Sequence, residues 1–284
     1  MTGGSSGAAL TDDQIQEHYA KARAALREAQ AGLTASHEQF RALSPHVLNA
    51  SGRGQINQAL WDCERALGRR PHHFSQSGQD AFLDERIFGG KTGGVFVEVG
   101  GYDGITGSNC LFFEMMRGWS GLLIEPSPGY HALCQQRRRV ECLQLACGGE
   151  EGVAEFLDIL QGMKQMSGLL GSYEPGILDK VKADPRHQGD VIEVEIRPLG
   201  ALLDERGMAE IDYISLDVEG AEMDVLSGFP FDRIAVTAWT VENTTADRDV
   251  PNLRAEKGYR RVEALGVGFT PPSSFRGEGG LSAQ

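Results

Sequence analysis

The sequence lacks the features of a membrane-spanning or exported protein. No run of about 18 apolar residues, the length that a membrane-spanning helix needs, occurs in the chain. The N-terminus does not have the layout of a signal peptide, in which a basic segment precedes an apolar one. We therefore expect a cytoplasmic protein without a membrane span.

Paired cysteines are missing as well. The five cysteines are odd in number, and no two of them form a C-x-x-C pair. This argues against a disulfide framework or a zinc site and is typical of single buried thiols in a reducing compartment. Hydrophobic residues make up 40% of the chain, so a core can close without disulfides or a structural metal.

Basic residues are scarce relative to acidic ones. The chain has 27 lysines and arginines against 40 aspartates and glutamates, which gives a net charge of −13. Such a charge repels phosphate groups, so nucleic acid is not an expected partner. The one basic run, Arg137–Arg139, is short and typical of a solvated helix end.

Helical periodicity dominates the N-terminal part. Behind a capping box formed by Thr11 and Gln14, apolar residues recur at spacings of four and three as far as Leu43. A second helix is expected over 54–67. Residues 10–70 are thus predicted to form a helical extension, and two interpretations of it stay open. It is either a hairpin packed on the rest of the chain or a coiled coil that makes a homodimer or docks a partner.

Strands and helices alternate along the remainder of the chain. We predict strands at 95–99, 121–124, 141–146, 153–158, 191–197, 211–216 and 235–241. Helices are expected at 108–117, 129–138, 199–206 and 221–227. Residues 161–189 are rich in glycine, methionine and proline and are expected to form an irregular insertion. The alternation predicts an α/β fold with a mostly parallel, doubly wound sheet over residues 71–271. Residues 1–9 and 272–284 are predicted to be a disordered and a flexible tail.

A glycine-rich loop follows the first predicted strand. Ligands of doubly wound sheets bind at the carboxyl ends of the strands. Glu98 stands at this end, and Gly100 and Gly104 let the following turn run close to a bulky ligand. Glu98 or Asp103 could bind an ammonium group through a charge-assisted hydrogen bond.

The same loop does not match a dinucleotide-binding fingerprint. That fingerprint needs glycine at positions 102 and 105, where this sequence has Tyr102 and Ile105. A nicotinamide oxidoreductase is therefore disfavoured.

An acid also ends the second predicted strand. The apolar run Leu122–Ile124 leads directly into Glu125. A carboxylate at this place accepts hydrogen bonds from both ribose hydroxyls in nucleoside-binding Rossmann folds. The alternative is a surface acid that merely ends a strand.

Further acids gather at the ends of the predicted strands 211–216 and 235–241. Asp217, Glu219 and Glu222 crowd one strand-to-helix turn, and Glu242 and Asn243 end the next strand. Such crowding raises at least one pKa and indicates a ligand, a cation or a proton-transfer role. Asp217, Glu242 and Asn243 could hold Mg²⁺, could bind substrate or act as a general base, or could be structural. Glu219 or Glu222 could simply cap the next helix.

Several motifs occur together in an order that is known from one family. They are Phe74–Asp80, Val95–Gly104, Ser108–Asn109, Gly118–Pro126, Ser167–Leu169, Leu216–Glu222 and Val241–Asn243. With these motifs, residues 74–262 resemble the FkbM family of S-adenosylmethionine (SAM)-dependent methyltransferases. Gln79 and Glu98 stand where the family usually has an acid and an aspartate, and both changes are mild.

The resemblance implies a class I methyltransferase fold, a Rossmann-like doubly wound sheet, behind the helical N-terminal extension. It implies a SAM pocket, for which we name Gln76, Glu98, Gly100, Gly101, Asp103, Ser108, Asn109, Glu125 and Pro126. It also implies methyl transfer to a hydroxyl group of a sugar, a glycan or a polar secondary metabolite.

An alcohol that accepts a methyl group must lose its proton. Asp217 is the first choice of catalytic base, followed by Glu242 and Glu219, and His187 becomes a candidate if its loop closes over the site. The rival hypothesis is an assembly protein that binds SAM or a nucleoside without turnover and is held to partners by its N-terminal helix.

Overall fold

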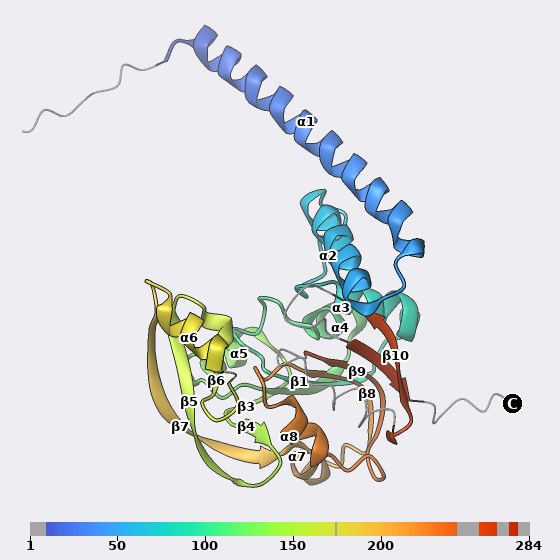
Figure 1. Cartoon of the computed structure of the whole chain (residues 1–284), viewed down its shortest axis with the longest axis vertical. Helices are drawn as coiled ribbons and strands as arrows, with labels where there is room; N and C mark the ends of the chain where they lie inside the picture. Colours follow the sequence, from blue (N-terminus) through green and yellow to red (C-terminus); the bar gives the residue numbers. More distant parts are fainter. Residues whose placement is uncertain (1–9, 174, 243–255, 266–272, 278–284) are drawn as a thin grey trace, which may run out of the picture.

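The computed structural model describes residues 10–173, 175–242, 256–265 and 273–277. Two helices at the N-terminal end lead into an α/β body (Figure 1). Within the described residues, no helix combines the length and the apolar character that crossing a membrane requires.

The N-terminal extension is helical, as predicted. Helix α1 (Asp12–Leu43) begins at the predicted capping box, in which Thr11 and Gln14 each bond the other's backbone N–H. A short turn, η1 (Ser44–His46), leads into α2 (Ala50–Ala66). The end of α1 packs on α2, whereas its first two thirds project away from the body (Figure 1).

A seven-stranded sheet forms the centre of the body, in the order β10-β11-β9-β8-β1-β2-β3. Strands β1, β2, β3, β8 and β9 are parallel, and β11 runs antiparallel to its neighbours β9 and β10. The prediction of a mostly parallel α/β sheet is confirmed. The strands are β1 (Val95–Val99), β2 (Ser120–Ile124), β3 (Glu141–Leu143), β8 (Glu210–Leu216), β9 (Ala235–Val241), β10 (Tyr259–Ala264) and β11 (Ser273–Gly277).

Helices cover both faces of this sheet because side chains alternate along each strand. On β1, Phe96 packs in an aromatic cluster with Phe113, whereas Val97 and Val99 pack in an aliphatic cluster with Leu203. The helices of the body are α3 (Gln79–Phe82), η2 (Leu83–Phe88), α4 (Leu111–Arg117), α5 (Pro128–Arg137), α6 (Pro175–Ala183), α7 (Leu199–Glu205) and α8 (Glu222–Ser227).

A second sheet of four strands, in the order β4-β7-β5-β6, lies beside the first. It consists of β4 (Ala146–Gly148), β5 (Gly152–Gln161), β6 (Gly168–Leu169) and β7 (Gln188–Pro198). The prediction of an irregular insertion over 161–189 is therefore wrong. That segment contains the short helix η3 (Lys164–Met166), β6, α6 and the beginning of β7. Its composition hides the two strands because β6 and β7 form by pairing with β5.

Two other predicted boundaries need correction. The predicted strand 141–146 divides into β3, which pairs with β2, and β4, which pairs with β7 of the other sheet. The predicted flexible tail 272–284 includes β11, which is ordered by pairing with both β9 and β10. Neither pairing leaves a signal in the local sequence.

Candidate active site

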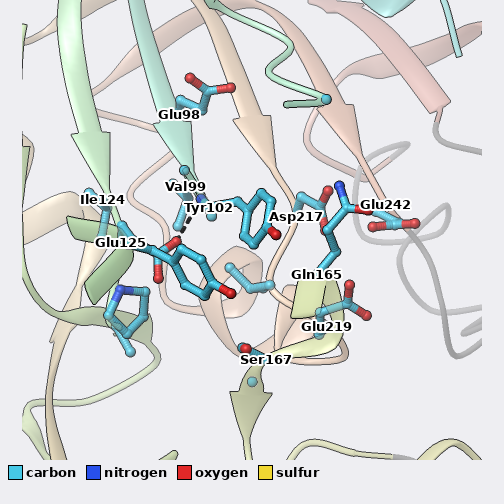
Figure 2. A pocket seen from close by; sticks show the side chains of 18 of the residues that line it. Glu98, Val99, Tyr102, Ile124, Glu125, Gln165, Ser167, Asp217, Glu219 and Glu242 are labelled. Atoms are coloured by element: carbon cyan, nitrogen blue, oxygen red, sulfur yellow. Dashed lines mark hydrogen bonds between the residues drawn. The ribbon is translucent and has the colours of Figure 1, made fainter. Parts of the chain in front are cut away.

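The parallel strands bring their carboxyl ends together at one pocket. The backbone N–H of Asp217 donates to Val99 O (3.0 Å), and that of Glu242 donates to Leu216 O (2.9 Å). Each of these acids is therefore the first residue after its own strand, and its backbone is hydrogen-bonded to the last residue of the neighbouring strand. Glu125 and the cluster of Asp217, Glu219 and Glu242 project into the same pocket (Figure 2).

The loop after β1 requires its first glycine. Gly100 has a φ of 92°, and a Cβ at this position would lie 1.9 Å from the backbone oxygen of Asp217. The backbone N–H groups of Gly100 and Gly101 both donate to Ile124 O at the end of β2. The glycines thus allow the ends of β1, β2 and β8 to contact one another closely. Tyr102 follows in a left-handed conformation with φ 45°.

Glu125 lies at the end of β2 and is 5% exposed. Its carboxylate accepts the backbone N–H of Tyr102 (2.7 Å) and of Ser127 (2.9 Å). Burial raises the pKa of Glu125 to about 8, although these two hydrogen bonds lower it. The rings of Tyr102 and Tyr130 pack beside it with centroids 4.5 Å apart. Neither tyrosine was foreseen from the sequence.

Glu98 lies in the pocket wall, but its carboxylate has partners within the protein. It accepts hydrogen bonds from the Ser108 hydroxyl (2.8 Å), from the Asn109 backbone N–H (3.0 Å) and from Arg138 (2.7 Å). Arg138 is fully buried and also pairs with Glu114 at 2.6 Å. Figure 2 shows the Glu98 carboxylate turned away from Glu125 and Asp217. Its charge is therefore neutralised by an arginine that the sequence had placed at a solvated helix end.

Asp103 does not belong to the pocket. Its carboxylate accepts the backbone N–H groups of Ile105 (3.0 Å) and Thr106 (2.7 Å) and pairs with Arg137 at 2.9 Å. This is the local turn that an aspartate makes with the backbone two and three residues on. The residues that line the pocket do not include Asp103 or His187, so the structure does not bring either into the site.

Asp217, Glu219 and Glu242 offer carboxylate oxygens that lie within 4.8 Å of one another. Burial is the main cause of a raised pKa for each of the three. The charge of Glu242 and a hydrogen bond with it raise the pKa of Asp217 further, and the same hydrogen bond lowers that of Glu242. Asp217 and Glu242 are therefore joined by a hydrogen bond and titrate as a coupled pair.

The turn that carries Glu219 is strained. Glu219 has a φ of 53°, and its Oε2 is buried without a hydrogen-bond partner among the described residues. Glu222, by contrast, accepts the backbone N–H groups of Val218 (3.3 Å) and Gly220 (3.2 Å) and so serves the turn itself. A non-glycine residue in the left-handed region is typical of functional sites, where the surrounding structure enforces it.

The second sheet and the segment before β6 close the pocket. Phe156 of β5 and residues 164–169 line it, opposite the strand ends. Asp158, two residues after Phe156 on the same side of β5, is not among the residues that line the pocket. It is 7% exposed, and its Oδ1 has no hydrogen-bond partner among the described residues. The charge of Asp158 raises the pKa of Glu125, which places it near that carboxylate. This wall was not predicted from the sequence, although Ser167–Leu169 is one of the sequence motifs.

Most of the predicted pocket residues line the pocket, namely Gln76, Glu98, Gly100, Gly101, Ser108, Asn109, Glu125, Pro126, Asp217, Glu219 and Glu242. Asn109 donates to the Ser215 hydroxyl at 2.9 Å, and its Oδ1 is buried without a partner among the described residues. Asn243, predicted as a metal ligand, lies outside the described residues.

The fold and this site define a class of protein, the class I SAM-dependent methyltransferases. The family model for the methyltransferase FkbM domain matches residues 98–261 of the sequence. The chain belongs to the FkbM methyltransferase family. None of the curated proteins matches the sequence significantly.

Solved structures with a similar fold are distant in sequence. An FkbM methyltransferase from Methylobacillus flagellatus is 12% identical with a TM-score of 0.43, and the match covers 87% of this chain and 60% of that one. A TehB-like SAM-dependent methyltransferase from Corynebacterium glutamicum is 10% identical with a TM-score of 0.39, covering 77% and 94%. A SAM-dependent methyltransferase from Aquifex aeolicus is 13% identical with a TM-score of 0.36, covering 73% and 91%. At these values, none of them informs the details of the site.

Proposed function

We propose that this protein transfers the methyl group of SAM to a hydroxyl oxygen of a sugar, a glycan or a polar secondary metabolite. The observation that carries the proposal is the arrangement of carboxylates in one pocket. Glu125 stands on one side, where a nucleoside is expected, and the hydrogen-bonded pair Asp217–Glu242 stands on the other. SAM supplies an electrophilic methyl group, and the pair supplies a base for the alcohol proton.

The chemistry of the residues that line the pocket suits SAM. Gly100 and Gly101 line the pocket with backbone alone, and the free oxygen of Asn109 offers an acceptor. We assign Glu125 to the ribose hydroxyls and Glu98, through Ser108 and Asn109, to positioning of the loop.

We further assign Asp158 to recognition of the adenine ring. Pro126, Tyr130 and Phe156 provide apolar surface next to Glu125, as an adenine ring requires. Asp158 does not itself line the pocket, but it is buried on the Phe156 side of β5 with a free carboxylate oxygen, and its charge acts on Glu125. The exocyclic amino group of adenine is a hydrogen-bond donor that this oxygen can accept, and an unpaired buried carboxylate is otherwise costly.

For the acceptor, we propose that the Asp217–Glu242 pair takes up the hydroxyl proton. A carboxylate whose pKa is raised is a stronger base than an ordinary one. Because the two groups are coupled, the pair titrates as a unit. Glu219, with its free oxygen, lies within reach to orient the acceptor. A divalent cation is a second use of these three carboxylates, and we rank it below proton uptake because Asp217 and Glu242 already bond each other.

The test has two stages. Titration calorimetry with SAM and with S-adenosylhomocysteine measures binding, and turnover is then measured on a panel of sugars and glycans, with and without a chelator. Absence of binding contradicts the proposal. Binding without turnover on any acceptor would favour the rival hypothesis, an assembly protein that uses the nucleoside site only for regulation.

The five free cysteines support our expectation of a reducing, cytoplasmic setting.

A further inference from the structure

Helix α2 contacts the wall of the pocket, although it precedes the residues that the family model matches. Gln76 lines the pocket, and Ser77 follows it in the segment that leads into α3. Gln58 of α2 bonds this segment twice. Its Nε2 donates to Gln76 O (3.3 Å), and its Oε1 accepts the Ser77 hydroxyl (2.7 Å). The helical extension therefore supports one side of the site.

The side-chain amide of Gln58 has one orientation that suits its neighbours. Its Nε2 also donates to Asp62 Oδ1 (2.9 Å), one turn further along α2. If the amide were turned over, its oxygen would face Gln76 O and Asp62 Oδ1, and both of these are acceptors. The contact between α2 and the segment is therefore specific in direction, and an alanine at position 58 cannot make it.

Trp61, one turn after Gln58, packs on the backbone of the same segment. Gly78 has a φ of 78°, and a Cβ at this position would lie 2.9 Å from Trp61 Cε3. Trp61 is 5% exposed, and the centroid of its ring lies 6.1 Å from that of His73. His73 in turn stacks on Phe112 of α4 at 4.4 Å. The start and the end of the segment are thus both packed against α2 (Figure 1).

Helix α2 is itself fixed to the central sheet. Arg53 pairs with Glu263 of β10 at 2.6 Å, and Asn57 Nδ2 donates to Ala264 O at 2.8 Å. Both contacts come from the turns of α2 just before Gln58. A helix that is anchored to the sheet can hold the segment at a set distance from the strand ends.

The segment lies against the loop that leads to Glu98. A Cβ at Gly107 would lie 3.0 Å from Cγ and Nε2 of Gln76, and the backbone of Ser75 forms an isolated parallel bridge with Gly107. Gly107 precedes Ser108, whose hydroxyl donates to Glu98 at 2.8 Å. Gln76 and Gly107 both line the pocket, so a shift of the segment changes this part of its wall.

We propose that Gln58 is a positioning residue of the SAM site and acts through Gln76. It holds the backbone of Gln76 and Ser77 so that this part of the wall is formed before the ligand binds. Without Gln58, binding has to order the segment, and the cost of ordering lowers the affinity. The inference rests on the proposed function only in taking SAM as the ligand, and it does not depend on the acceptor.

Titration calorimetry with S-adenosylhomocysteine tests the effect on binding. Gln58→Ala should raise the dissociation constant about fivefold, since it removes two hydrogen bonds to the segment. The matched control is Gln55→Ala, which changes the same residue type on an exposed site of the same helix and should have an effect below about twofold. Equal dissociation constants of Gln58→Ala and wild type, or equal effects of the two variants, would overturn the inference.

A double variant separates positioning from a general loss of stability. Ser77→Ala removes the hydroxyl that Gln58 accepts, and Ser77 does not itself line the pocket. Because both changes break the same contact, Gln58→Ala with Ser77→Ala should bind no more weakly than Gln58→Ala alone. Effects that add in full would overturn the assignment to this contact.

Hydrogen exchange of the free protein tests the same idea without a ligand. Gln58→Ala should speed the exchange of the amides of residues 75–79 about fivefold, whereas the amides of residues 121–127 around Glu125 should exchange as in wild type. Gln55→Ala should leave both unchanged. Unaltered exchange of residues 75–79 in Gln58→Ala would overturn the inference. Wild type that does not bind S-adenosylhomocysteine would contradict the proposed function instead, and exchange would then decide whether Gln58 holds the segment.

Discussion

Glu125 is expected to release a proton when the adenosyl ligand binds. In the free protein its pKa is about 8, because burial and the nearby charges of Asp158 and Asp217 outweigh two backbone hydrogen bonds. Ribose hydroxyls that donate to the carboxylate stabilise its charged form and therefore lower this pKa. Binding is thus linked to ionisation of one identified group.

The expected number of released protons follows from the difference between this pKa and the pH of the measurement. At about pH 7, one unit below the pKa, roughly a tenth of Glu125 is ionised, so binding should release close to one proton. The affinity should rise about tenfold between about pH 7 and pH 9 and level off above the pKa. Glu125→Gln keeps the shape but removes the charge. It should weaken binding about 10- to 100-fold, since hydrogen bonds to a charged group contribute about 1.5–3 kcal/mol.

Titration calorimetry with S-adenosylhomocysteine in buffers of different ionisation enthalpy counts the released protons. This ligand has the same ribose but no sulfonium charge, so the measurement isolates the carboxylate–ribose contact. The reasoning is refuted if wild type releases no proton, if Glu125→Gln releases the same number, or if that variant binds as tightly as wild type.

Four further outcomes are expected. Asp217→Asn should lower kcat about 10²- to 10⁴-fold while the dissociation constant of S-adenosylhomocysteine stays within about threefold, and an unchanged kcat would remove Asp217 from the role of base. Asp158→Asn should reverse the preference for S-adenosylhomocysteine over its 6-oxo (inosine) analogue, because an amide can donate a hydrogen bond to the oxo group. The matched control is Asp190→Asn, which lies opposite Asp158 on β7 and is exposed. An unaltered preference in Asp158→Asn would contradict the adenine assignment. Arg138→Met should lower the free energy of unfolding in urea by about 3–5 kcal/mol, since Glu98 and Glu114 would remain buried and unpaired; a loss below about 1 kcal/mol would refute their dependence on Arg138. Stability of the free protein should fall as pH rises from about 5 to about 8, because folded Glu125 binds its proton more tightly (about 8 against 4.5). Glu125 contributes a loss on the order of 4 kcal/mol, complete only above its folded pKa, and the fall in Glu125→Gln should be smaller by about that amount. The fall that remains in the variant comes from the other buried carboxyl groups with raised pKa values, among them Asp217 and Glu222.

The sequence by itself determined the strands of the central sheet and the residues at their ends. β1 and β9 have the predicted bounds because each is an apolar, β-branched run that is recognisable without its neighbours. Parallel strands with intervening helices must end at one edge, so Glu125, Asp217 and Glu242 could be expected to meet there. The FkbM motifs added the family.

Only the tertiary structure decided what those residues contact. Arg138 follows α5, far from Glu98 in the chain, and no local pattern indicates that it enters the core to neutralise that carboxylate. The wall that carries Phe156 and Asp158 exists because β5 pairs with β7 across a long separation in sequence. β11 is likewise a strand because β9 and β10 lie on either side of it. Local propensity sets where strands and turns can form, whereas pairing, burial and charge neutralisation depend on contacts between distant residues, which a single sequence does not reveal.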